Sequence, residues 1–487
     1  MEWGPGMRIA IIGGGIAGLA AAYELEKARA AGALVEYTLF EERPRLGGSL
    51  ASEIVDGAVL ERGPDSFLTE KPAAAELCRE LGLSGELIPS NDAARKTYIV
   101  VRNRLVALPD GLMFLVPTKL VPTVLTRLFS VRTKMRMAFE LLHPPLPSNG
   151  DEPVAALVVR HFGQEAVDRL ADPLLRGIYG GDAAQLSAQT VLPRLVEMEA
   201  KYGSLTRGML AAHRQVRARA KASVQNVRSG GTVGAVFTAL LGGMQQIVDA
   251  ITARLDAGSV RTSTPVRRIE KMARGWHLHA GGGTENFDAL IMAAPAWSAG
   301  ELLTPVDAAL GGELSAIPYA SSITVNLIYD ESKIGALPQG FGFLVPAVER
   351  RAMLACTFAH RKFLGRTPPG KAVFRAFLGG AKHDDMLARS DAALIAVVRR
   401  EMHEILGAKT IVAETEPDFV QVTRWPRAMA QYAVGHKERM QRVAARLAAL
   451  PGLRLAGNAY DGIGVPDCIR LGRKAAREVL ALNANSM

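Results

Sequence analysis

The sequence predicts an α/β protein whose first domain is assembled from both ends of the chain, and two segments support this prediction. Near the start, an apolar strand at residues 8–12 runs into a glycine turn at 13–18 and then into a helical pattern from Leu19. Near the end, a strand that begins at residue 453 meets a second glycine turn, and a helical pattern follows residue 465. Strand, glycine turn and helix in this order are typical of nucleotide-binding α/β folds. We therefore expect one discontinuous, Rossmann-like domain.

The first glycine turn is suited to a dinucleotide. Glycines in this pattern allow a tight turn, the approach of a pyrophosphate to the backbone, and close packing of helix on strand. The helix N-terminus adds amide donors and the positive end of the helix dipole. The expected cofactor contacts in this turn are Gly13, Gly15, Ile16, Ala17 and Gly18.

The next predicted strand, 35–40, ends at Glu41, where such folds carry the carboxylate that accepts hydrogen bonds from the ribose hydroxyls. Glu41 alone does not distinguish NAD from FAD. The acid is followed four residues on by Arg45 and then by Gly47 and Gly48, and this stretch resembles the second conserved stretch of the amine-oxidase-like flavoproteins. NAD enzymes generally lack it, so the resemblance implies FAD.

The C-terminal segment completes the expected cofactor site. Its helix N-terminus is expected to face flavin or phosphate oxygens, because it offers free amides and a positive dipole end. The further expected FAD contacts are Trp425, Gly457, Asn458 and Val465.

Composition is that of an ordinary globular protein. With 48% hydrophobic and 22% charged residues the chain can build a large core, and wholesale disorder is not expected. Cys78, Cys356 and Cys468 lack the spacing of a disulfide framework or a zinc site, and the histidines show no metal-ligand spacing. We expect no metal and a cytoplasmic protein. No apolar run approaches the ~20 residues of a transmembrane helix.

Positive charge is concentrated in two regions that hold most of the net charge of +10. Region 95–137 combines arginine and lysine with many large apolar residues. Region 201–228 has no acid and contains Arg207, Arg214, Arg217, Arg219 and Lys221. Basic and apolar side chains together predict peripheral contact with an anionic membrane, on the inner face of the cytoplasmic membrane, with a solvated basic face as the alternative. Nucleic acid is not expected, because stacking aromatics are not interleaved with the basic residues.

A more specific resemblance rests on four stretches: 63–67 (Gly-Pro-Asp-Ser-Phe), 176–187, 424–436 and 456–464. They are similar to stretches of the bacterial protoporphyrinogen oxidases and of their coproporphyrinogen-oxidising relatives. Together with the flavin stretches, the resemblance spans nearly the whole chain. Flavin stretches alone would also admit amine oxidases and carotenoid desaturases, and the first two of the four narrow the choice.

The resemblance implies three domains. The FAD domain is expected at 1–70, 229–300 and 440–487; an α+β substrate domain with an antiparallel sheet at 71–94, 206–228 and 301–439; and a mostly helical, membrane-facing domain at 95–205. Strand-like runs at 322–329 and 372–378 are compatible with the antiparallel sheet. A helix is predicted over 237–255.

The resemblance also suggests residues that hold the substrate. Lys71, which follows the 63–67 turn, is the expected anchor for a propionate, although a solvated lysine at a helix start is an equally good interpretation. Gly177 is expected to lie against the macrocycle, where a side chain would crowd it. Candidate apolar walls, with core packing as the competing interpretation, are Phe343, Leu344 and Phe363.

The favoured function is oxidation of protoporphyrinogen IX to protoporphyrin IX in haem synthesis, with O2 as acceptor and H2O2 as product. FAD carries this chemistry, so no catalytic side chain is expected. The closest competing substrate is coproporphyrinogen III, which has more propionates and favours a more cationic site. Less favoured functions are those of a carotenoid desaturase, an amine oxidase and a non-catalytic flavin-binding protein. A homodimer is expected only by analogy.

Overall fold

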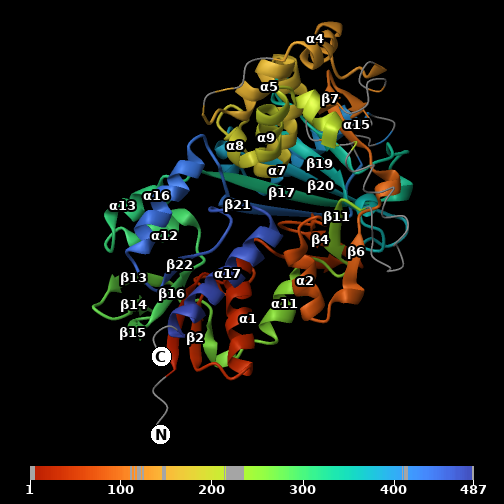
Figure 1. Ribbon diagram of the computed structural model, residues 1–487. Coiled ribbons are helices and arrows are strands. Elements are labelled where there is room, and N and C mark those ends of the chain that lie inside the picture. Colours follow the sequence, from red (N-terminus) through yellow and green to blue (C-terminus); the bar gives the residue numbers. More distant parts are fainter. Residues whose placement is uncertain are drawn as a thin grey trace, which may run out of the picture. The chain divides into compact units, whose positions relative to one another are not determined.

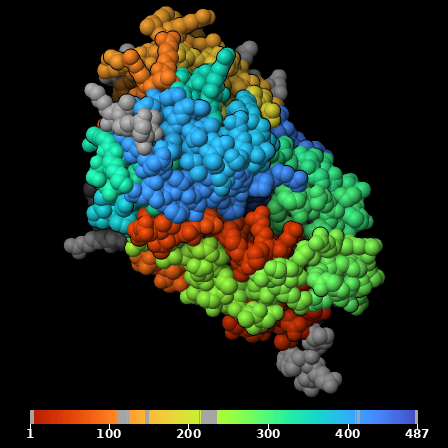
Figure 2. All heavy atoms as spheres, turned by 180° about the vertical axis from the view of Figure 1, so that it is seen from behind, coloured from red at the N-terminus to blue at the C-terminus, as the bar shows by residue number. Residues whose placement is uncertain are grey.

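The computed structural model describes residues 6–109, 112–113, 116–117, 122, 125–144, 148, 150–212, 214, 235–407, 410 and 415–484. The chain forms two compact units, each built from separated segments. Unit 1 contains Met1–Ser90, Val236–Pro318 and Glu438–Met487, and unit 2 contains Asn91–Ala235 and Tyr319–Lys437. In Figure 2 the red atoms of the N-terminal segment and the green atoms of the middle segment lie side by side in unit 1.

Unit 1 is built on a five-stranded parallel sheet in the order β12-β2-β1-β16-β22 (Figure 1). Its central strands are rich in buried Ile, Leu and Ala, as expected for parallel strands covered on both faces. The pairing of β16 with β22 joins the C-terminal segment to the N-terminal one, as predicted. The strands are β1 (Met7–Ile12), β2 (Val35–Phe40), β12 (Val260–Arg261), β16 (Ala289–Met292) and β22 (Leu453–Leu455).

Helices cover both faces of this sheet. On one face α1, α2, α11 and α17 share a core, and Figure 1 shows α1 and α17 side by side. On the other face α12, α13 and α16 pack with Phe40 and Leu290. The helices are α1 (Ile16–Ala30), α2 (Pro72–Glu80), α11 (Gln245–Thr252), α12 (Ala296–Leu303), α13 (Ala308–Ser315), α16 (His436–Ala448) and α17 (Val465–Ala484).

Three small antiparallel sheets complete unit 1: the hairpin β3-β4, the sheet β5-β11-β6 and the sheet β13-β14-β15. The strands are β3 (Ser52–Val55), β4 (Ala58–Glu61), β5 (Phe67–Leu68), β6 (Leu87–Pro89), β11 (Phe237–Leu240), β13 (Val266–Lys271), β14 (Trp276–Ala280) and β15 (Gly283–Phe287).

The predicted helix over 237–255 is wrong in its first part. Residues Phe237–Leu240 form β11, which pairs with β5 on one side and β6 on the other. Gly243, with φ of +100°, then ends the extended segment, and the helix begins only at Gln245. Tertiary pairing with two distant strands overrides the local preference of this short segment.

Unit 2 is built on a seven-stranded sheet in the order β21-β17-β20-β19-β18-β7-β8, in which only β18 and β7 run parallel. Its strands confirm the predicted runs at 322–329 and 372–378. They are β7 (Thr97–Val101), β8 (Arg104–Ala107), β17 (Tyr319–Asp330), β18 (Gly342–Leu344), β19 (Met353–Phe358), β20 (Lys371–Gly379) and β21 (Phe419–Ala430).

The two faces of this sheet differ in polarity. On β17, Ile323, Val325 and Leu327 point to a core shared with α15 (Asp391–Leu406). The intervening Thr324 and Asn326 point to the opposite face, because neighbouring residues of a strand alternate. On β17, therefore, one face is apolar and the other polar.

Further helices of unit 2 form a second core with part of the sheet. They are α4 (Val131–Leu142), α5 (Val154–Phe162), α6 (Gln164–Ala166), α7 (Asp172–Tyr179), α8 (Ala188–Val191) and α9 (Pro193–Tyr202). The short helix α14 (Ala359–Lys362) contacts β20 and β19 instead. The helical segment and the antiparallel sheet thus lie in the same compact unit, and the finer three-domain division stays a prediction.

The basic region 95–137 is described only in part, and Arg217, Arg219 and Lys221 of the second basic region lie outside the described residues. Within the part of the chain that the structure describes, no helix has both the length and the apolar character needed to cross a bilayer.

Candidate cofactor and substrate site

The first glycine turn has the geometry of a phosphate-binding loop. Gly13 adopts φ of +109° and donates from its N–H to the carbonyl oxygen of Phe40 at 2.8 Å. A Cβ on Gly13 would lie 2.8 Å from the carbonyl of Ala293, and a Cβ on Gly18 would overlap the carbonyl oxygen of Gly13. Only glycine fits either position, so the turn stays tight against the sheet.

The second glycine pair packs directly on the first turn. Gly47 donates from its N–H to the carbonyl oxygen of Gly14 at 2.8 Å, and a Cβ on Gly48 would lie 3.1 Å from the Cα of Gly15. The Cβ position of Gly15 itself is open, with its nearest neighbour 3.9 Å away. The two turns therefore form one bare backbone surface at the start of α1, which suits a pyrophosphate.

Glu41 lies at the rim of this surface. Its Oε2 accepts a hydrogen bond from the Gly14 N–H at 2.6 Å, and its Oε1 accepts one from the Arg43 N–H at 2.9 Å. These two bonds fix the carboxylate beside the glycine turn. A carboxylate oxygen can accept more than one hydrogen bond, so ribose hydroxyls fit here as further donors.

Arg45 turns toward the backbone of its own loop. Its guanidinium donates to the carbonyl oxygens of Leu46 at 2.9 Å and Leu50 at 3.0 Å, and also to that of Gly48. Burial, with Arg43 and Arg62 nearby, lowers the pKa of Arg45. In this structure Arg45 holds the second glycine turn in shape. It also lines an open groove of about 770 Å³ beside α11.

The C-terminal segment reaches the first turn of α1. Ala456 donates from its N–H to the carbonyl oxygen of Met292 at 2.9 Å, and Gly457 adopts φ of +136°. A Cβ on Gly472 of α17 would overlap the carbonyl oxygen of Ala17 in α1. Sequence reasoning missed Gly472, because its need for a bare backbone appears only where the two helices cross.

Lys71 is held at the N-terminus of α17. Its Nζ lies 2.6 Å from Oδ2 of Asp467, and the same oxygen accepts the Gly464 N–H at 3.3 Å. The side chain of Lys71 remains 41% exposed. The structure therefore gives Lys71 an ionic partner that sequence reasoning did not identify.

Gly177 and Leu344 come together in unit 2. A Cβ on Gly177 in α7 would lie 3.1 Å from Cδ2 of Leu344 in β18. Phe343 points to the other face of the sheet, into the apolar core, with its ring 6.2 Å from that of Phe358. Phe363 is buried, and the guanidinium carbon of Arg366 lies 5.1 Å from its ring centroid. Of the three candidate walls, Leu344 shares a surface with Gly177.

A polar row on the same sheet face was missed by sequence reasoning. Thr357, Arg375, Asn326 and Gln421 face one another in register across β19, β20, β17 and β21. Arg375 is buried, and its guanidinium carbon lies 4.7 Å from the ring centroid of Phe377. Because Phe377 pairs with Ala355, which pairs with Leu344, this row and Leu344 share one face.

Trp425 belongs to this face too, since it pairs with Ser322, two residues before Thr324 on β17. The signal was present in the sequence as polar residues at every second position of β17 (Ser322, Thr324, Asn326) and as Arg375 within the apolar run of β20. We refer to the row with Leu344 and Phe377 as the polar sheet face.

Metal and disulfide chemistry find no support among the described residues. Across these residues no three His, Cys, Asp or Glu side chains come together as a metal site. Cys78, Cys356 and Cys468 are free and buried, and burial raises the pKa of the Cys78 and Cys468 thiols to about 12.

Comparison with known proteins agrees with this geometry. The chain matches the family described as "Flavin containing amine oxidoreductase" over residues 16–480. Coproporphyrinogen III oxidase of Bacillus subtilis (strain 168) is 33% identical over 475 residues, 97% of each chain. Chloroplastic protoporphyrinogen oxidase of Nicotiana tabacum is 27% identical over 483 residues, 96% of this chain and 84% of that one. A solved structure, a provisionally named protoporphyrinogen oxidase from Exiguobacterium sp. 255-15, is 31% identical with a TM-score of 0.84, covering 98% of this chain and 99% of that one.

Proposed function

Since the chain belongs to the family of flavin-containing amine oxidoreductases, we propose that it is an FAD-dependent oxidase of porphyrinogens that acts in haem synthesis. The observation that carries this proposal is full-length similarity to porphyrinogen oxidases, over 97% of the chain for the Bacillus subtilis protein. Amine oxidases and carotenoid desaturases share the flavin stretches but are less well supported as functions.

Between the two porphyrinogens, we favour coproporphyrinogen III. The relatives named coproporphyrinogen III oxidase reach 33% identity, whereas the plant protoporphyrinogen oxidase reaches 27%. This reverses the order in which the two substrates were predicted. The buried guanidinium of Arg375 on the polar sheet face supports a substrate with several carboxylates, because guanidinium and carboxylate match in charge and geometry.

We assign FAD to the glycine surface of unit 1. The bare backbone at Gly15 and Gly48 suits the pyrophosphate, and Glu41 is positioned to accept from the ribose. Bound FAD would supply the redox chemistry, taking hydride from the macrocycle and passing electrons to O2 to give H2O2. We keep the other expected contacts, namely Arg45, Trp425, Gly457, Asn458 and Val465, as part of this proposal.

The protein's own part is to bind and orient the macrocycle. We propose that Leu344 and the bare backbone of Gly177, both in unit 2, lie against its apolar ring. As a separate proposal, Lys71 of unit 1 binds a propionate. Phe343 and Phe363 would support this surface from the cores in which they are buried. Holding a flexible ring in one orientation lowers the entropic part of the barrier.

A side-by-side aerobic assay tests the function. Flavin-loaded protein is given coproporphyrinogen III or protoporphyrinogen IX, and porphyrin fluorescence is corrected for autoxidation. We expect a higher kcat/KM with coproporphyrinogen III. A preference for protoporphyrinogen IX would reverse the substrate assignment, and no enzyme-dependent signal with either would reject the function.

We also propose peripheral contact with an anionic membrane, supported by the outer face of α4. Val131, Met135, Phe139 and Leu142 recur at helical spacing and are 72%, 54%, 54% and 65% exposed. Arg132 and Lys134 lie on the same helix. Exposed apolar side chains flanked by cations suit the boundary between acyl chains and acidic headgroups.

Sedimentation with vesicles tests this contact. The protein should bind vesicles rich in anionic lipid at low salt, and Phe139→Ser with Met135→Ser should weaken that binding. Ile54→Ser is the matched control, because Ile54 is similarly exposed at 63% but lies on β3. Equal binding by all three proteins, or none by wild type, would remove the proposal.

Homodimerisation stays a prediction by analogy that sedimentation equilibrium would check.

A further inference from the structure

Helix α4 packs against its unit in an unusual way. Its buried residues are Thr133, Met137 and Glu140, of which only Met137 is apolar. Surface helices are ordinarily held by an apolar stripe that faces the core. Because α4 carries most of its large apolar side chains on the outer face, polar contacts supplement Met137 in holding its inner face.

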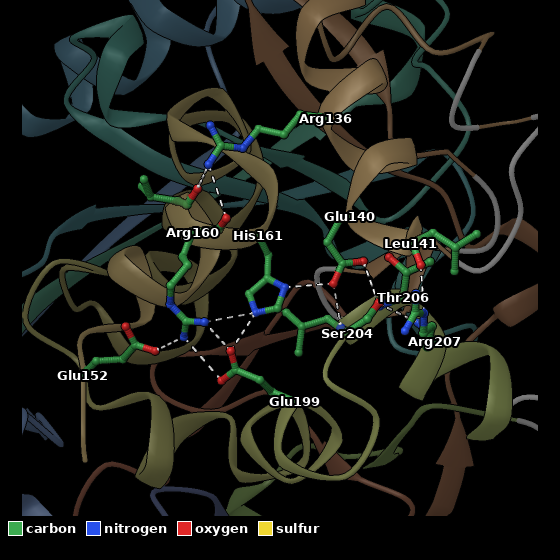
Figure 3. Close-up of polar contacts among 12 residues, drawn as sticks. Arg136, Glu140, Leu141, Glu152, Arg160, His161, Glu199, Ser204, Thr206 and Arg207 are labelled. Carbon is green, nitrogen blue, oxygen red and sulfur yellow. Dashed lines mark hydrogen bonds and ion pairs between the residues drawn. The ribbon is translucent and has the colours of Figure 1, made fainter. Parts of the chain in front are cut away.

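Glu140 makes most of these contacts (Figure 3). Its Oε1 lies 2.8 Å from the Leu205 N and 2.8 Å from Nδ1 of His161. Its Oε2 lies 2.9 Å from Oγ of Ser204 and 3.3 Å from the Thr206 N. Glu140 therefore joins α4 both to α5 and to the start of the helical segment that begins at Leu205.

His161 lies between two carboxylates. Its Nδ1 is 2.8 Å from Oε1 of Glu140, and its Nε2 is 2.9 Å from Oε1 of Glu199 in α9, with the His161 side chain fully buried. A carboxylate oxygen can only accept, whereas a neutral imidazole has a single N–H to donate. In the neutral ring one lone pair would face a carboxylate, and only the imidazolium satisfies both contacts.

We infer that His161 of α5 is held as a buried imidazolium whose two N–H groups donate to Glu140 of α4 and to Glu199 of α9, so that the charged ring fastens α5 to both helices. The arrangement is independent of the proposed activity and of any partner of the outer face of α4. It fixes which side of α4 faces outward.

The surrounding charges agree with this assignment. Arg160 donates to both Glu199 and Glu152, so one guanidinium already serves two of the carboxylates beside His161. Nη1 of Arg160 lies 3.5 Å from Nε2 of His161, and each of these two nitrogens also contacts Oε1 of Glu199.

Two further arginines nearby donate to carbonyl oxygens. Arg136 donates to Val159 at 2.7 Å, and Arg207 donates to Leu141 at 2.8 Å, so neither neutralises these carboxylates. Burial raises the pKa of Glu140, but hydrogen bonds, led by the one from His161, outweigh it and hold that pKa below its ordinary value.

The imidazolium is tested directly by NMR. With histidine labelled at Cε1, the His161 resonance should keep the shift of a charged ring at about pH 8, where an ordinary histidine is neutral. It is assigned by its loss in His161→Gln, or, if that variant does not fold, by eliminating the other histidines singly. A neutral-ring shift at that same pH would overturn the inference.

Hydrogen exchange tests the attachment of α4 in the flavin-loaded full chain. After correction for intrinsic rates, protection of α4 should fall at alkaline pH while that of α17 stays constant. In His161→Gln, the amide hydrogens of α4 should exchange about tenfold faster than in the wild type at neutral pH. His143→Gln is the control, because His143 is exposed at the end of the same helix. Equal protection in His161→Gln and wild type would contradict the inference.

Discussion

At the scale of single residues, Lys71 carries a positive charge where a substrate carboxylate can replace its ionic partner. Lys71 caps the start of α2 and pairs with Asp467, which in turn accepts the N–H of Gly464. The lysine is partly exposed, so its ammonium is accessible to a second carboxylate. An exposed ion pair is worth little to stability, which makes a binding role easy to separate from a structural one.

Lys71→Ala should raise the KM for the porphyrinogen about tenfold while the FAD content stays unchanged, because one charged hydrogen bond to the substrate is lost. Steady-state kinetics and the flavin spectrum measure both quantities. Lys27→Ala is the matched control, since Lys27 pairs with Glu80 at 2.9 Å and is 44% exposed. If the KM of Lys71→Ala is unaltered, Lys71 does not bind the substrate, and the ion pair with Asp467 is the role that remains.

At the scale of the elements, the cofactor site depends on the packing of helix α1 against helix α17. Their crossing is close because Gly472 has no side chain opposite the backbone of Ala17. Arg473, the next residue, is buried and donates to Glu24 of α1 at 2.9 Å and to Glu80 of α2. One crossing therefore fixes three helices of unit 1.

Gly472→Ala should destabilise the protein by about 1–3 kcal/mol and weaken FAD retention, because the added methyl meets a main-chain oxygen that cannot move freely. Thermal unfolding and the flavin-to-protein absorbance ratio check this. Gly312→Ala in α13 is the control, since no atom lies within 4 Å of its Cβ position. That change should be neutral or slightly stabilising, because alanine is the better helix former.

At the scale of the whole molecule, glutamates paired with arginine set the response to acid. Hydrogen bonds to arginine outweigh burial and lower the pKa of Glu24, Glu80 and Glu199 below the ordinary value of 4.5. Such groups bind fewer protons in the folded state than in the unfolded chain. Their contribution to the free energy of unfolding is complete above 4.5 and is lost as the pH falls through the folded values.

The melting temperature should therefore fall steeply below about pH 4.5 and change little between neutral pH and that value. In Arg473→Gln, the fall of the melting temperature below about pH 4.5 should be less steep, and the melting temperature at neutral pH should be lower. Arg470→Gln, which breaks an exposed pair with Asp461, should change neither. Scanning calorimetry over this pH range makes the comparison. If the melting temperature falls equally steeply at acid pH in the wild type, Arg473→Gln and Arg470→Gln, the role of the Arg473 pairs is rejected.

Most of the elements and the glycine turn were predicted from the sequence, whereas the sequence did not predict which candidate substrate residues share a surface. Helix α2 begins at Pro72 and strands β17 and β20 cover their predicted runs. By contrast, the alternation on β18 puts Phe343 in the core and Leu344 beside Gly177. Which face of a strand is buried depends on what packs over it, and that is set by distant segments.

By itself the sequence determined the strand, glycine turn and helix at the start of the chain, the acid at Glu41, and the family resemblance, because turn chemistry and periodicity act over a few residues. Only the tertiary structure decided that Lys71 meets Asp467, that α1 crosses α17 at Gly472, and that His161 lies between two carboxylates. These contacts join residues far apart in the chain. They exist because packing of the core brings particular helix faces together, and no local pattern records that outcome.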